Sequence, residues 1–72
     1  MPFVNVKVVE GVFTAEQKQQ MIRKLTDTMV SIEGEYLRPV VCVVVEEVQS
    51  GDWGIAGNPI TTSKVKEMSR AK

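Results

Sequence analysis

The sequence predicts an α/β protein in which a strand, a long helix and a second strand form a βαβ unit, followed by a loop or hairpin and a short helix. Three observations predict this class. Hydrophobicity alternates with period two over residues 2–9, apolar side chains recur at helical spacing over residues 14–33, and residues 40–45 are continuously apolar. A chain of 72 residues is expected to form one domain, residues 1–72.

The first strand is predicted over residues 2–9, because β-branched valines occupy every second position, and it ends at Glu10-Gly11. Pro2 is a suitable first residue for a strand, where its missing N–H costs nothing. Removal of Met1 would give Pro2 a second property, a free secondary amine that can act as a base or a nucleophile. Both interpretations of Pro2 are open at this point.

The helix is predicted over residues 14–33. Thr14 and Gln17 have the spacing of a capping box, and Gly34 is a typical C-terminal stop. The expected apolar stripe consists of Met21, Ile22, Leu25, Met29 and Ile32. We interpret its methionines as core residues rather than as a ligand surface.

Residues 40–45 are apolar at every position, which is typical of a strand buried on both faces of a parallel sheet. Cys42 within this run is interpreted as a small buried apolar residue rather than a reactive thiol. Two parallel strands leave long unpaired edges, and so small a domain usually needs a staple. One cysteine and no histidine rule out an internal disulfide or a zinc site, so we expect an oligomer.

Residues 49–59 contain three glycines and the only tryptophan, Trp53, and are expected to form a shaped loop or hairpin. Their glycine spacing does not match a phosphate-binding loop. A large rigid ring on such a loop serves as a pocket wall or as an anchor against a neighbouring subunit, and both alternatives stand. A short helix is predicted from about Lys64 to Arg70.

The formal net charge is zero, which argues against nucleic acid or an anionic membrane as the main partner. No signal peptide or membrane span is indicated, so a cytoplasmic protein is expected. There is no Ser-His-Asp set and no metal cluster, and no cofactor is expected.

Glu46 and Glu47 are neighbours on a strand and should point to opposite faces. The most suggestive group left is the Pro2 amine. Burial or a nearby cation would lower the pKa of such an amine and suit it to general-base work.

The chain resembles the 4-oxalocrotonate tautomerase family. The resemblance rests on the Met1-Pro2 start, Glu10-Gly11, the run Thr14–Lys18, the valine-rich strand that ends at Glu47, and Gly51–Gly57. It implies a βαβ tautomerase subunit, two copies of which form a four-stranded sheet, commonly within a hexamer of three dimers. It also implies that Met1 is removed and that Pro2 is the general base in the tautomerisation or isomerisation of a small enol or unsaturated 2-keto acid. Trp53 stands where the family has an aromatic pocket wall.

Two departures from the family concern its substrate-binding arginines. Val12 stands where a carboxylate-binding arginine follows the first strand, and Cys42 stands where a second arginine lies in the second strand. The implied pocket is therefore unusually apolar, with Val9, Val12, Cys42 and Trp53 around one base. Arg38, Lys7 or a basic residue of another subunit could replace the missing cations. A substrate less anionic than a dicarboxylate is expected.

Three alternatives stand beside this interpretation. The chain could be a dehalogenase or hydratase of unsaturated acids, with Glu47 or Asp52 activating water, although that chemistry needs arginines for the substrate carboxylate and their absence counts against it. It could be a non-catalytic relative that binds a small ligand or a protein. It could also be one half of a hetero-oligomer whose second subunit carries the arginines. In every catalytic case, retention of Met1 would leave the Pro2 nitrogen as a non-basic amide.

Overall fold

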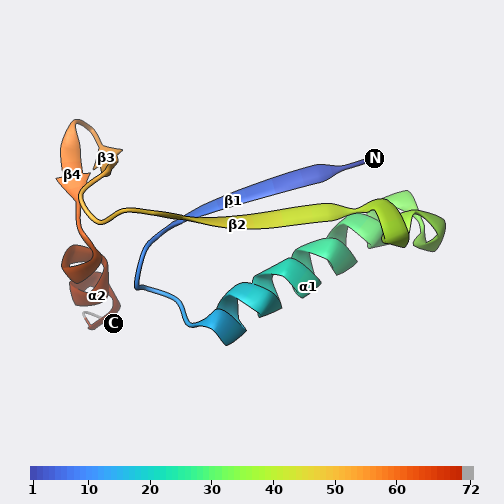
Figure 1. The fold of residues 1–72 in the computed structure, drawn as a ribbon, viewed down its shortest axis with the longest axis horizontal. Coiled ribbons are helices and arrows are strands. Elements are labelled where there is room, and N and C mark those ends of the chain that lie inside the picture. Colours follow the sequence, from blue (N-terminus) through green and yellow to red (C-terminus); the bar gives the residue numbers. More distant parts are fainter. Residues whose placement is uncertain (71–72) are drawn as a thin grey trace.

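The computed structural model describes residues 1–70, without the side chain of Arg70, so the last two residues of the predicted domain lie outside it. Figure 1 shows the arrangement of its elements. In order these are β1 (Phe3–Val9), α1 (Ala15–Glu33), the 3-10 helix η1 (Glu35–Val40), β2 (Cys42–Val48), β3 (Trp53–Ile55), β4 (Asn58–Ile60) and α2 (Thr62–Arg70). The predicted βαβ unit, hairpin and short C-terminal helix are confirmed.

The central sheet pairs β1 with β2 in parallel, from Phe3 opposite Cys42 to Val9 opposite Val48. Its second strand begins two residues later than predicted, because Val40 closes the 3-10 helix that contains Pro39. The strand also continues beyond the apolar run to Val48, since pairing with β1 continues that far. The start of β2 is therefore set by the 3-10 helix before it and its end by pairing with β1, and neither follows from the apolar run.

Helix α1 connects the two strands and packs along the sheet (Figure 1). The predicted capping box is present: the Gln17 N–H donates to Thr14 Oγ1 at 3.1 Å, and the Gln17 side chain accepts from the Thr14 N–H at 2.9 Å. Gly34 ends the helix at φ 114°, and its N–H donates to the Val30 carbonyl at 2.8 Å. Within residues 1–70, no helix combines the length and the apolar character that crossing a membrane requires.

The helix covers one face of the sheet only. On the opposite face, Phe3 is 67% exposed, Val44 is 37% exposed and Cys42 is also exposed. The predictions that this strand is buried on both faces and that Cys42 is a buried residue are therefore not met in the single chain. The sequence pattern requires a cover for the second face, which one copy of the chain does not provide.

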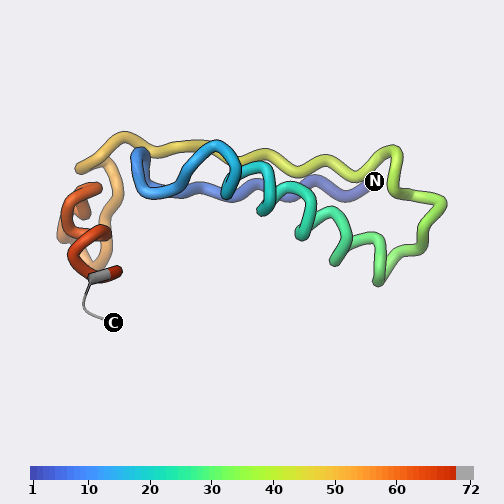
Figure 2. Tube along the Cα trace, turned by 90° about the horizontal axis from the view of Figure 1, so that it is seen from below, coloured from blue at the N-terminus to red at the C-terminus, as the bar shows by residue number. Residues whose placement is uncertain are grey.

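The β3–β4 hairpin and α2 lie beyond one end of the sheet, far from the N-terminus (Figure 1 and Figure 2). The radius of gyration is consequently 14.9 Å, whereas a compact chain of this length would have about 11 Å. Among the described residues, the buried apolar side chains are Val8, Val9 and Val30. A core this small is marginal for a chain that folds alone, as expected for the oligomer predicted from the sequence.

Candidate functional site

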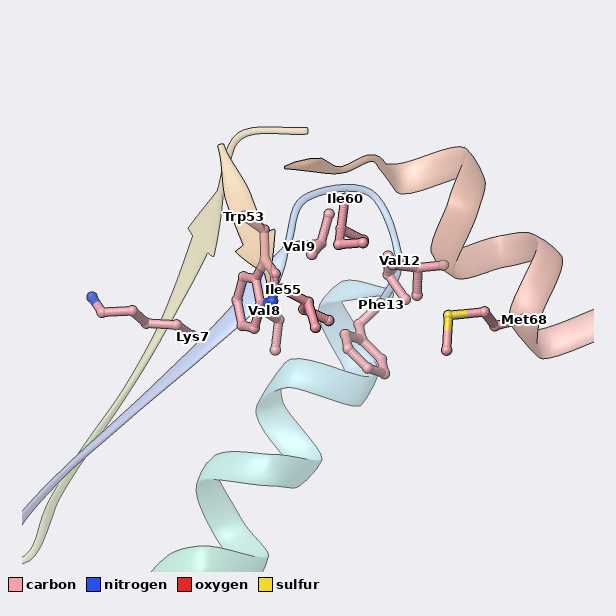
Figure 3. A pocket seen from close by; sticks show the side chains of 10 residues that line it. Lys7, Val8, Val9, Val12, Phe13, Trp53, Ile55, Ile60 and Met68 are labelled. Atoms are coloured by element: carbon pink, nitrogen blue, oxygen red, sulfur yellow. The ribbon is translucent and has the colours of Figure 1, made fainter. Parts of the chain in front are cut away.

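An open apolar cavity of about 280 Å³ lies between the end of β1, the segment before α1, the hairpin and α2. Figure 3 shows that the side chains of most of its lining residues converge, while that of Lys7 points away. Nine of the ten lining residues have apolar side chains: Val8, Val9, Val12, Phe13, Trp53, Ile55, Ile60, Val65 and Met68. The cavity is therefore suited to holding a hydrocarbon group.

The hairpin positions Trp53 in this cavity. Trp53 pairs with Ile60 at the open end of the hairpin, and the turn at its other end contains Ala56 and Gly57, with φ values of 53° and 81°. A second turn precedes Trp53, in which the Asp52 N–H donates to the Gln49 carbonyl at 2.9 Å, and the Gly51 N–H joins this turn to β4 by donating to the Ile60 carbonyl at 3.0 Å. Trp53 thus forms a pocket wall, one of the two roles open from the sequence, while contact with another subunit stays a prediction.

A hydrogen-bond network joins the hairpin and α2 to the end of β1. Thr62 Oγ1 donates to the Glu10 carbonyl at 2.6 Å, and the Thr62 N–H donates to Ser50 Oγ at 2.9 Å. The Ser50 N–H donates in turn to Glu10 Oε1 at 3.0 Å. Gly11 fits between these parts at φ 75°, where an added Cβ would lie 3.3 Å from Thr62 Cγ2. This network holds Val12 and Trp53 on opposite sides of the cavity.

The site residues predicted from the sequence divide into two groups. Val9, Val12 and Trp53 line the cavity, whereas Pro2 and Cys42 lie at the other end of the sheet, where the Cys42 N–H donates to the Pro2 carbonyl at 3.2 Å. The seven residues of β1 separate the groups by about 20 Å. Cys42 therefore does not line this cavity within one chain, because the strand that carries it starts at the opposite end.

Arg38 also lies at the Pro2 end, in η1, and its charge is already paired. Its guanidinium is 2.8 Å from Asp27 Oδ1 and 2.6 Å from Glu35 Oε1. The hydrogen bond from Arg38 lowers the pKa of Glu35, and the same contact raises the pKa of Arg38. Arg38 would have to leave both carboxylates before it could bind a substrate anion.

Lys7 is the charged residue among those described around the cavity, and it is paired as well. Its Nζ is 3.3 Å from Glu46 Oε1. Hydrogen bonds from Asn5 first, and then from Lys7, lower the pKa of Glu46. Glu47 faces the helix side, where it contacts Lys18 Nζ at 3.3 Å and accepts from the Gly11 N–H at 3.3 Å. The predicted opposite orientation of Glu46 and Glu47 is confirmed.

Sequence reasoning missed several residues that line the cavity, including Phe13, Ile55 and Ile60. Val65 and Met68 were detectable, since their spacing gives the short C-terminal helix an apolar side. Within residues 1–70, no cluster of three or more His, Cys, Asp or Glu side chains could hold a metal ion. The cavity can therefore bind an apolar group, and a base for catalysis would have to come from a residue that does not line it in the single chain.

Comparisons with known proteins place this architecture among characterised folds. Residues 2–63 match the family model for the tautomerase enzyme. The chain is 39% identical over 61 residues to probable tautomerase K2 of Dickeya dadantii, covering 85% of this chain and 90% of that protein. It is 40% identical over 62 residues to a probable tautomerase of Helicobacter pylori, covering 83% and 90%.

Solved structures share the fold. DmpI from Helicobacter pylori superposes with a TM-score of 0.71 at 35% identity, over 82% of this chain and 95% of that chain. YwhB, a homologue of 4-oxalocrotonate tautomerase, superposes with a TM-score of 0.72 at 31% identity, over 81% and 92%. The fold of this chain is therefore a known architecture.

Proposed function

The chain belongs to the tautomerase family, and we propose that it is an isomerase whose general base is the amine of Pro2, freed by removal of Met1. The substrate is a small enol or unsaturated 2-keto acid. The amine takes a proton from the enol oxygen or from a carbon next to the carbonyl, and returns it at another carbon or at oxygen. No net gain or loss of atoms or electrons accompanies the reaction, so it needs no cofactor.

The position of Pro2 supports this role. It begins the sheet, and its carbonyl is held by the Cys42 N–H at 3.2 Å, which fixes the direction of the nitrogen that precedes it. Met1 is 91% exposed, so an aminopeptidase could reach it. A secondary amine fixed at the end of a rigid strand is a preorganised base.

One observation carries the proposal of a shared site: Pro2 and the Trp53 cavity lie at opposite ends of a strand whose outer edge is free. Within residues 1–70, β1 pairs with β2 alone. Identical edge strands related by a two-fold axis pair antiparallel, so the start of one strand lies beside the end of the other. Pairing through β1 would therefore bring Pro2 of each copy to the cavity of the other and make a four-stranded sheet.

Pairing through β2 would not complete the site. Two β2 strands would then separate the two β1 strands, and strand spacing would hold these about 14 Å apart. The cavity is lined from β1, from the segments that follow it, and from the hairpin and α2, but not from β2. The β1 edge is therefore the one whose pairing unites base and pocket.

Further association covers what the dimer leaves open. Phe3 and Val44 remain on the uncovered face of the sheet, since both helices of a dimer built in this way lie on the other side. The exposure of these apolar side chains in the single chain supports the expected hexamer of three dimers, in which that face would be covered. A second subunit type with its own cations would be a hetero-oligomer, which native mass spectrometry distinguishes from copies of one chain.

The dehalogenase or hydratase alternative has less support. It requires a carboxylate at the site to activate water, but Glu47 is engaged by Lys18 and by the Gly11 N–H on the helix side, and Asp52 is not among the residues that line the cavity. It also requires cations for the substrate acid, and Arg38 and Lys7 are both paired. These contacts favour proton transfer by a single base.

The test combines processing with activity. Intact mass should show the loss of Met1, and the processed protein should ketonise an arylenolpyruvate. Pro2→Ala should lower kcat by at least about 100-fold, the usual size of a general-base contribution. Pro39→Ala, in η1, is the matched control and should keep activity. Equal activity of the Pro2→Ala variant would refute the assignment of the base, and absence of turnover of any enol by the processed protein would favour a non-catalytic role.

A further inference from the structure

We infer that the Trp53 cavity selects substrates whose far end is an uncharged aryl or branched alkyl group, and that it rejects a second carboxylate there. This inference rests on the proposed function, because it concerns the end of the substrate that does not react.

The cavity has the size and the apolar walls to hold an aromatic ring. An engineered protein cavity of roughly 150 Å³ with apolar walls holds benzene, and the volume here is about 280 Å³. A substituted aromatic ring therefore fits. The walls come from Val9, Val12, Phe13 and Ile60 together with the ring of Trp53 (Figure 3). Such walls favour a second aromatic ring in an offset or edge-to-face arrangement.

The described residues that line the cavity offer no unpaired cation to a carboxylate. Among the described residues that line the cavity, Lys7 is the cation, and Glu46 already neutralises it at 3.3 Å. Lys64 and Lys66 flank Val65 on α2, but neither lines the cavity. A carboxylate that entered would exchange water for hydrocarbon without gaining a partner.

No carboxylate stands among the described residues that line the cavity, and these residues include no cation that is free of its own ion pair. The cavity therefore discriminates through the cost of removing a charged group from water as well as through attraction of hydrocarbon.

The experiment uses matched enols that differ only at the far end of the ring. The processed oligomer is assayed with the enols of phenylpyruvate, 4-methylphenylpyruvate and 4-carboxyphenylpyruvate. The 4-carboxy substrate should have a kcat/KM at least about tenfold lower than the 4-methyl substrate, mainly through KM, since one misplaced group in an apolar pocket has at least this effect. Equal or higher kcat/KM for the 4-carboxy substrate would overturn the inference.

Two variants at one wall separate charge from size. Val12→Arg introduces a cation into the cavity and should reverse the preference toward the 4-carboxy substrate. Val12→Gln has a similar chain length without the charge and should not reverse it. If neither variant changes the ratio of the two kcat/KM values, the charge argument is wrong.

A binding measurement keeps this inference distinct from the proposed function. Trp53 is the only tryptophan, so its fluorescence reports on the cavity directly. Phenylpyruvate and 4-carboxyphenylpyruvate should quench it with different affinities, the uncharged ring binding more tightly. Tighter binding of the uncharged ring without turnover would overturn the proposed function and support the cavity assignment. Pro2-dependent turnover with no discrimination would do the reverse.

Discussion

Replacement of Asn5 by proline tests the free edge of β1. The Cys42 N–H donates to the Pro2 carbonyl and the Glu10 N–H donates to the Val48 carbonyl. The alternation of a parallel ladder therefore directs the backbone groups of even-numbered β1 residues toward β2, and those of odd-numbered residues such as Asn5 toward the outer edge. Asn5→Pro removes a donor from that edge and leaves the bonds to β2 intact.

The expected size of the effect follows from symmetry. A two-fold dimer contains the substituted position twice, so two interchain hydrogen bonds are lost. At about 1 kcal/mol each, this is about 2 kcal/mol, or roughly a 30-fold weaker dimer. Steric exclusion by the two proline rings adds to this loss.

Sedimentation equilibrium over a range of protein concentrations measures the effect. Asn5→Ala is the matched control, because it removes the side-chain hydrogen bond from Asn5 to Glu46 but keeps the backbone N–H. Asn5→Pro should dissociate at concentrations where Asn5→Ala remains associated, and it should lose activity in parallel. An Asn5→Pro protein with unchanged association would refute pairing through the β1 edge.

Two further predictions concern the network beside the cavity and the ion pair at the opposite end. Thr62→Val removes the hydrogen bond to the Glu10 carbonyl and should lower the free energy of unfolding in urea by about 1 kcal/mol. Thr62→Ser keeps the hydroxyl and should keep this stability. Equal stability of the two variants would show that the network does not hold the hairpin. The pKa of Glu35 lies below its ordinary value of 4.5, chiefly through the hydrogen bond from Arg38, so this contact stabilises the fold above that pH and its contribution is lost as the pH falls through the lowered pKa. Arg38→Gln should raise the pKa of Glu35 in a carboxyl-carbon NMR titration, and an unchanged pKa would show that the contact is absent in solution.

Local signals in the sequence were sufficient for the elements that depend on neighbours in the chain. The Thr14–Gln17 capping box and the Gly34 stop each involve groups within four residues, and the structure contains both. The ends of β2 could not be found in this way. Residues 40–45 are all apolar, and only the 3-10 helix before them and the pairing with β1 decide which of them belong to the strand.

The candidate site shows the same limit more strongly. Trp53 and Val12 could be proposed as pocket residues from composition and family resemblance, and the structure places both around the cavity. Ile60 joins them through a hairpin register that no local pattern specifies. The separation of Pro2 from Trp53 follows from strand length and becomes evident only when a single chain is seen in three dimensions.

The most direct test of the central claim is an experimental structure of the processed oligomer. In that structure Met1 should be absent, and the Pro2 nitrogen of one copy should face the cavity lined by Trp53 and Val12 of the copy paired with it through β1. A structure in which Met1 is retained, or in which Pro2 lies away from every Trp53 cavity, would contradict the proposal that this proline is the base.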